Sequence, residues 1–133
     1  MHSTLFPEVT GRSIIVPTAS TPTIEIDTRP VDDLCEARPV LLVSNRLKCA
    51  LENSTLTGMT LSTLIQRKSE QFELLYPDLQ LPLFWWLQVL GRAGEDDFGI
   101  GPSGALVVSP AALSLIETFH VEFLFHRPFV AAT

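Results

Sequence analysis

The sequence predicts a single α+β domain, with a mixed or mostly antiparallel sheet and two short helices that each follow a capping serine. Three observations support this fold class. The chain has 133 residues, enough for one hydrophobic core. Its 46% hydrophobic and 18% charged residues indicate a compact, rather apolar interior, since an average domain has roughly 25% charged residues. A strand–helix–strand pattern occurs twice, around Ser44 and Ser109.

The first of these two units begins with the continuous apolar run PVLLV, which is suited to a buried strand over 39–43. Ser44 follows directly and is a preferred residue for the N-terminal cap of a helix. Apolar residues then recur at the i, i+3, i+4 spacing, which predicts a helix over 45–53. Alternation of apolar and polar residues predicts a second strand over 59–65.

The second unit repeats this order near the end of the chain. A short apolar strand over 105–108 leads to Ser109 as the cap, and Pro110 stands at the first helical position, where its missing N–H costs nothing. A helix is predicted over 110–118. Alternation over 120–126 then predicts a strand.

The remaining segments carry weaker patterns. Residues 1–38 are rich in proline and are expected to be extended, with strands near 13–16 and 23–27. A helix of one or two turns is predicted after Ser69. The apolar segment 84–90 is expected to form the most buried strand.

The predicted core consists of apolar residues on the inner faces of these helices and strands. They are Leu42, Leu47, Leu51, Leu87, Val89, Val107, Leu115, Ile116 and Val121. Truncating a buried aliphatic side chain usually costs about 2–5 kcal/mol, so mutation can test the assigned faces.

The segment DFGIGPSGALVVSP at 97–110 contains two well-known short patterns. The triplet 97–99 matches the metal-binding triplet of kinases, but a kinase also needs a partnered lysine and a catalytic loop, so we interpret the match as chance. The glycine pattern resembles a nucleotide-binding loop, which must lead into a helix, whereas Gly104 leads into a strand. Proline at the second and glycine at the fourth position of 101–104 instead predict a type I turn within a hairpin.

Charge and hydropathy restrict the partners. The net charge of −6 argues against nucleic acid and favours a basic protein partner. The first 20 residues lack the features of a secretory signal, and the apolar run at 81–91 is too short to span a membrane. We therefore expect a cytoplasmic, soluble protein in which Cys35 and Cys49 are reduced, structural thiols.

No group of residues predicts catalysis, a metal site or a cofactor. His120 and His126 would share one face of the strand expected over 120–126, but no further ligands accompany them. Ser44 and Ser109 do not lie in the G-x-S-x-G pattern of a nucleophile, and helix capping accounts for both.

Two neighbouring groups are candidates for contact with a partner protein. Glu95, Asp96 and Asp97 form an acidic cluster, which is either a solvated loop or a recognition loop for a basic partner. Trp85 and Trp86 face opposite sides of their predicted strand, so at most one is expected to point fully into the core. The other could act as an aromatic anchor at an interface, with core packing as the alternative.

Three stretches together resemble a known family: PVLLVSNRLKCALENSTLTGMTL, LYPDLQLPLFWWLQVLGR and DDFGIGPSGALVVSPAALSLIETFHVEF. The resemblance is to the small immunity proteins encoded beside polymorphic toxins and type VI secretion effectors in proteobacteria. It covers about residues 39–126 and leaves 1–38 outside.

The resemblance implies a single immunity-like domain that neutralises a cognate toxin by occlusion, without turnover. Combined with the charge, it predicts a toxin with a basic binding surface. A small enzyme and a structural or homo-oligomeric module remain the alternatives, and a homodimer is left open.

Overall fold

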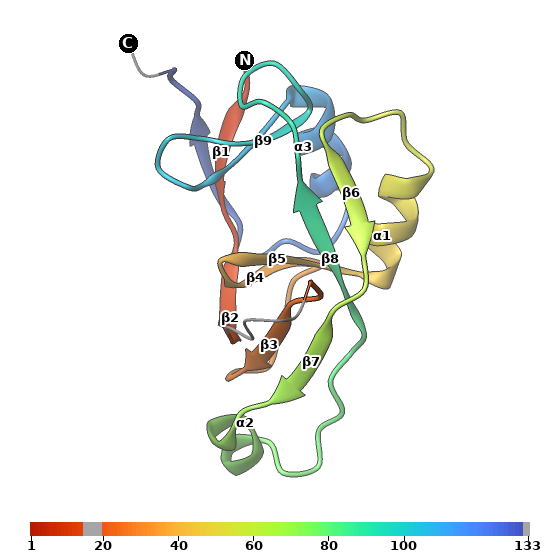
Figure 1. Ribbon diagram of the computed structural model, residues 1–133, viewed down its shortest axis with the longest axis vertical. Helices are drawn as coiled ribbons and strands as arrows, with labels where there is room; N and C mark the ends of the chain where they lie inside the picture. The colour runs from red at the N-terminus through yellow and green to blue at the C-terminus, as the bar shows by residue number, and fades with distance from the viewer. Residues whose placement is uncertain (15–19, 132–133) are drawn as a thin grey trace.

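The computed structural model describes residues 1–14 and 20–131, which form strands of two sheets and three short helices (Figure 1). Within these residues the elements, in chain order, are β1 (Ser3–Phe6), β2 (Glu8–Ile14), β3 (Thr23–Ile26), β4 (Leu34–Arg38), β5 (Val40–Ser44), α1 (Asn45–Glu52), β6 (Met59–Ser62), β7 (Ile65–Lys68), α2 (Glu70–Leu75), β8 (Phe84–Val89), β9 (Phe98–Ile100), β10 (Leu106–Val108), α3 (Pro110–Glu117) and β11 (Phe125–Pro128). No described helix is long and apolar enough to cross a membrane.

The two sheets confirm the predicted α+β class. The smaller sheet has the order β11-β1-β10-β9 and is antiparallel throughout. The larger has the order β6-β8-β5-β4-β2-β3-β7, in which the pairs β2–β4 and β3–β7 are parallel. The chain passes from one sheet to the other at Pro7, between β1 and β2. Residues 1–38, for which strands were expected only near 13–16 and 23–27, thus supply β1 to the smaller sheet and β2, β3 and β4 to the larger.

The larger sheet curls into a half-barrel, since β6 and β7 are consecutive in the chain but stand at opposite ends of the strand order. Gln66 on β7 spans the gap between β7 and the start of β8. Its side-chain amide donates to the carbonyl oxygen of Pro82 at 2.7 Å and accepts from the N–H of Phe84 at 3.0 Å. One side chain therefore makes the two hydrogen bonds that a neighbouring strand would make.

All three predicted serine caps are confirmed. The hydroxyl oxygens of Ser44, Ser69 and Ser109 each accept the backbone N–H three residues further on, at 3.1–3.2 Å. Pro110 is the first residue of α3, as expected. These caps are local features, which is why the starts of α1, α2 and α3 agree with the prediction.

The apolar side chains form two clusters. One lies among α1, α3 and both sheets, and the other lies among β3, β4, β5, α2 and the start of β8. Most of the predicted core residues are buried, while Val89, Leu115 and Val121 are partly buried against the first cluster. The largest fully buried side chains also include Phe72 and Phe98, which the prediction did not place in the core.

The hairpin predicted over 97–110 is confirmed. β9 and β10 pair antiparallel, and the N–H of Gly104 donates to the carbonyl oxygen of Gly101 at 2.9 Å, which closes the turn. Gly104 has φ of 85°, a conformation that other residues rarely adopt. The glycines at 99–104 therefore serve the turn and the strand pair.

The strand predicted over 120–126 is wrong, because β11 begins only at Phe125. The backbone N–H groups of His120, Glu122 and Phe123 donate instead to aspartate side chains of another segment. His120 and His126 consequently do not share a strand.

Other boundaries also differ from the prediction. The single strand expected over 59–65 is divided into β6 and β7. The strand expected over 13–16 is the end of β2, which begins at Glu8, and residues 15 and 16 lie outside the described part of the chain. β1 and β4 were not predicted, and β9 was expected only as the first half of the hairpin around 101–104.

Candidate functional site

Two aspartates, Asp33 and Asp97, occupy equivalent positions before the hairpins β4–β5 and β9–β10. The hydroxyl of the helix-capping serine after each hairpin, Ser44 or Ser109, donates to the carboxylate of the aspartate at 2.5 Å. The backbone N–H of the same serine donates to the aspartate carbonyl oxygen, at 2.8 Å and 2.9 Å respectively. An aspartate–hairpin–serine–helix unit therefore occurs twice in the fold.

The two units hold each other reciprocally. The second carboxylate oxygen of Asp33 accepts the N–H of His120, which follows α3 of the other unit, at 2.8 Å. The second oxygen of Asp97 accepts the N–H of Thr57, which follows α1, at 2.9 Å. Each carboxylate thus joins its own helix cap to the segment that leaves the other unit's helix. We call these two arrangements the aspartate clasps.

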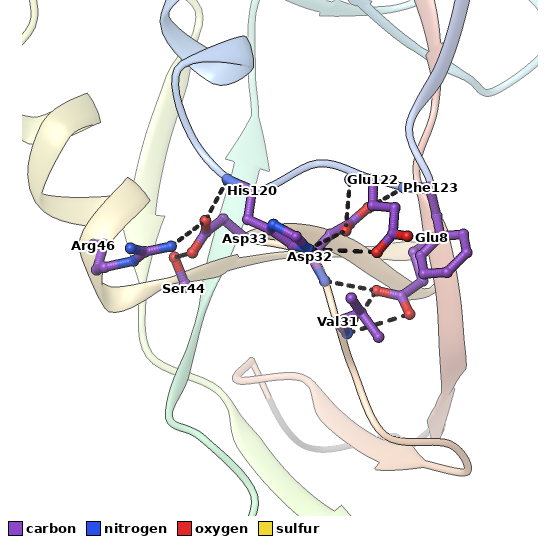
Figure 2. A network of polar contacts seen from close by, with 9 residues as sticks. All are labelled: Glu8, Val31, Asp32, Asp33, Ser44, Arg46, His120, Glu122 and Phe123. Atoms are coloured by element: carbon purple, nitrogen blue, oxygen red, sulfur yellow. Dashed lines mark hydrogen bonds and ion pairs between the residues drawn. The ribbon is translucent and has the colours of Figure 1, made fainter.

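Figure 2 shows the first clasp within a wider polar network. The two carboxylate oxygens of Asp32, whose side chain is fully buried, accept the N–H groups of Glu122 and Phe123 at 2.9 Å and 2.8 Å. Glu8, at the start of β2, accepts the N–H groups of Val31 and Asp32. The network therefore ties residues 120–123 to the segment around Asp32 and Asp33, which Glu8 in turn holds from β2.

The surroundings of both clasp carboxylates favour the charged form. Burial raises the pKa of Asp33, but hydrogen bonds from Ser44 and the His120 N–H and the ion pair with Arg46 outweigh it, so that pKa lies below its ordinary value. The hydrogen bond from Ser109, followed by that from the Thr57 N–H, lowers the pKa of Asp97. Both aspartates are therefore ionised at neutral pH.

Ser44, Asp33 and His120 have the composition of a catalytic triad but a different geometry. The hydroxyl of Ser44 bonds directly to Asp33, and His120 contributes only its backbone N–H to that carboxylate. The His120 ring instead lies near two other carboxylates, with Nε2 3.9 Å from Asp32 Oδ1 and 3.6 Å from Glu122 Oε2. This arrangement stabilises the fold and contains no serine–histidine contact.

The three carboxylates of the predicted acidic loop have different surroundings. Asp97 is bound in its clasp, and Asp96 Oδ2 accepts the N–H of Arg92 at 2.6 Å. Glu95 extends into solvent, with 67% of its side chain exposed and Oε2 3.5 Å from Arg92 Nη1. Of the three, Glu95 is therefore the most accessible to a partner, and the binding role of all three stays a prediction.

Trp85 and Trp86 lie on opposite faces of β8, as expected for adjacent strand residues. Trp85 packs against the first apolar cluster, its indole N–H donates to Asn45 Oδ1 at 3.2 Å, and Lys48 Nζ lies 4.1 Å from its ring centre. Trp86 lines an open hollow on the other face. Trp86 is therefore the better candidate for an anchor, and Trp85 has a structural role.

Three open hollows meet at Ile100 and form what we call the concave face. The first, of about 570 Å³, is lined by residues 90–93 together with Glu95 and Asp96. The second, of about 270 Å³, is lined by Trp86 and its neighbours on β8 together with Pro39 and Leu41. The third, of about 530 Å³, lies between the two hairpins and is lined by Phe6, Glu36, Arg38, Pro39, Leu41, Ser103, Gly104, Ala105 and Arg127, among others. Ile100 lines all three.

The concave face combines exposed apolar side chains with charges at its margins. Leu90 is 63% exposed, Ile100 45% and Phe6 40%. Glu95 lines the first hollow and Arg127 lines the third. Large apolar side chains left in water within a charged rim are typical of surfaces that bind other proteins.

Sequence reasoning found Glu95, Asp96 and Trp86 but missed Ile100 and Arg127. The missed residues carry no local signal, since the concave face exists only because hairpins distant in the sequence come together. The aspartate clasps did have a local signal in the sequence. Each capping serine is preceded, eleven or twelve residues earlier, by the second aspartate of an Asp-Asp pair.

Within residues 1–14 and 20–131, no cluster of three or more histidine, cysteine, aspartate or glutamate side chains could hold a metal ion.

Comparisons of the chain with family models, curated proteins and solved structures find no match.

Proposed function

We propose that this chain is a non-catalytic immunity protein, which binds a cognate bacterial toxin through the concave face and neutralises it by occlusion. The observation that carries the proposal is the meeting of three hollows at Ile100. It places Trp86 and Glu95 on one continuous surface with exposed apolar side chains. The resemblance of residues 39–126 to immunity proteins supplies the class of partner.

Each part of this face has a distinct physical role in the proposed complex. Ile100 and Leu90 lose contact with water when a partner covers them, which provides the apolar driving force. Trp86 offers a large, rigid side chain of the kind that is enriched at binding hot spots. The first hollow, lined by Glu95 and Asp96 against the single cation Arg92, is negative on a chain with net charge −6, which attracts a basic toxin surface and speeds encounter.

The hydrogen bonding of the polar side chains favours binding over catalysis. Ser44 and Ser109 are each engaged both as helix cap and as donor to an aspartate. Asp33 and Asp97 are held by several donors each. These four polar side chains therefore have structural partners, whereas Ile100, Leu90 and Glu95 on the concave face are open to a binding partner.

The test uses cells that express the toxin encoded beside this gene, together with binding measurements on the purified pair. Ile100→Asp places a charge at the centre of the proposed contact, and Trp86→Ala removes the anchor. Leu74→Asp is the matched control, because Leu74 is 78% exposed on α2 and does not line the three hollows. We expect each face variant to weaken binding at least about tenfold, since hot-spot truncations cost 2 kcal/mol or more. The control should bind as the wild type does.

Circular dichroism verifies that each variant is folded. If folded Ile100→Asp and Trp86→Ala both protect at low expression as well as the wild type does, the concave face is not the contact surface. If the wild-type chain neither binds the toxin nor protects, the immunity function is wrong.

A further inference from the structure

The third hollow of the concave face differs in charge from the rest of the molecule. Its charged lining residues are Glu36, Arg38 and Arg127. Arg38 Nε lies 3.1 Å from Glu36 Oε1, so these two charges neutralise each other. Arg127 then leaves the hollow with a net positive charge on a chain whose net charge is −6.

Arg127 also differs from most of the other cations. Of the nine lysines and arginines, six form ion pairs with carboxylates. Within the described residues, Arg127 forms no such ion pair, and its guanidinium carbon lies over the ring of Phe6 on the neighbouring strand, 5.2 Å from the ring centre. A cation–π contact of this kind does not use the guanidinium N–H donors, which can therefore make two parallel hydrogen bonds to a carboxylate.

The walls of the hollow contribute the apolar part of a binding site. Phe6, Pro39, Ile100 and Ala105 line it from β1 and from both hairpins. Its volume of about 530 Å³ is sufficient for a few side chains of a partner. A carboxylate flanked by apolar residues would match both the charge and the lining.

We propose that this hollow binds an acidic residue flanked by apolar side chains on the toxin, with Arg127 pairing with the carboxylate. This inference rests on the proposed function and adds to it that the partner surface is bipolar. Its basic region faces Glu95, and its acidic segment enters the hollow beside Arg127. A toxin surface that was basic throughout would attract Glu95 but would repel Arg127.

The first experiment measures affinity for the toxin encoded beside this gene. Arg127→Gln removes the charge, Arg127→Lys keeps the charge but not the planar donors, and Arg29→Gln is the matched control, because Arg29 is exposed, has no ion pair within the described residues and does not line this hollow. We expect Arg127→Gln to weaken binding about tenfold or more, Arg127→Lys to recover part of the loss, and Arg29→Gln to change the affinity less than about twofold. Equal affinities for Arg127→Gln and Arg29→Gln would overturn the inference while leaving the proposed function intact.

The second experiment does not depend on the toxin. Nuclear magnetic resonance follows the ¹⁵N-labelled chain during titration with the peptide acetyl-Phe-Glu-Phe-amide and, as control, acetyl-Phe-Gln-Phe-amide. We expect the glutamate peptide to shift the Arg127 Nε–H signal and the Ser103 and Gly104 amides, the glutamine peptide to shift them much less, and Arg127→Gln to abolish the difference. Equal shifts with both peptides, or none with either, would contradict carboxylate binding in this hollow, whatever the toxin experiment shows.

Discussion

Asp97 receives hydrogen bonds from two directions, from Ser109 at the start of α3 and from Thr57 in the segment after α1. In Asp97→Asn the charge is lost, and the new amide NH₂ faces groups that donate. We expect the free energy of unfolding to fall by about 1.5–3 kcal/mol, the usual worth of hydrogen bonds to a charged group. Urea denaturation measures the change. Asp78→Asn makes the same chemical change at an exposed position and should have little effect, and equal stabilities of the two variants would contradict the clasp.

The clasps also predict how stability depends on pH. Asp33 and Asp97 have lower pKa values in the folded protein than the ordinary value of 3.8, so at acid pH the unfolded chain binds more protons than the folded chain. Their contribution is complete above about pH 5 and is lost as the pH falls through the folded-state pKa values. We therefore expect the free energy of unfolding to decrease between about pH 5 and pH 2.

The double variant Asp33→Asn/Asp97→Asn removes both titrating groups and is compared with the wild type by urea denaturation at several pH values. Its stability should be lower at neutral pH and should fall less steeply on acidification. Parallel curves for wild type and variant would show that other carboxylates cause the acid dependence.

The helices α1 and α3 are equivalent elements, and each buries one aliphatic residue seven positions after its capping serine. These residues are Leu51 and Ile116, each 1% exposed. Leu51→Ala and Ile116→Ala should each destabilise the fold by about 2–5 kcal/mol, because truncation removes buried methyl groups and leaves a cavity. Thermal or urea denaturation measures this, with Leu75→Ala as the control, since Leu75 is 55% exposed on α2. A Leu51→Ala variant as stable as that control would show that α1 packs through another face.

For the helices and strands, local features were predictable from the sequence, and pairing between distant segments was not. Ser44, Ser69 and Ser109 could be identified as caps because a capping hydroxyl bonds within three residues of itself. β1 could not, because it pairs with β10 and β11, more than a hundred residues away. The alternation around Val121 suggested a strand, but the carboxylates of Asp32 and Asp33 take the N–H groups that such a strand would use.

For the candidate site too, local patterns were predictable from the sequence and contacts between distant segments were not. The two-residue period of a strand correctly placed Trp85 and Trp86 on opposite faces, but which face is covered depends on Asn45 and Lys48, which contact Trp85 from α1. Net charge favoured a basic partner but could not identify Arg127 as a cation that lies over the Phe6 ring and forms no ion pair within residues 1–14 and 20–131. The contact between Arg127 and Phe6 exists only because β1 pairs with β11.

For the whole molecule, the concave face forms where the two sheets meet. Ile100 belongs to the smaller sheet, Trp86 to the larger, and Phe6 stands at the end of β1, just before the chain passes from one sheet to the other. The clasps lock the two hairpin–helix units together, and the gap between the hairpins becomes the third hollow. The proposed binding surface is thus a product of the complete fold.

The proposed binding surface is tested most directly by hydrogen exchange of the chain, free and bound to the toxin that we propose is encoded beside this gene. Docking on the concave face should slow exchange of the backbone amides at 36–41 and 98–106, because both hairpins line the hollows that the partner would cover. Amides of α2, which lies at the far end of the molecule in Figure 1, should exchange at the same rate in both states. Slowed exchange confined to α2 or to the outer surfaces of α1 and α3, with the hairpins unchanged, would contradict the account.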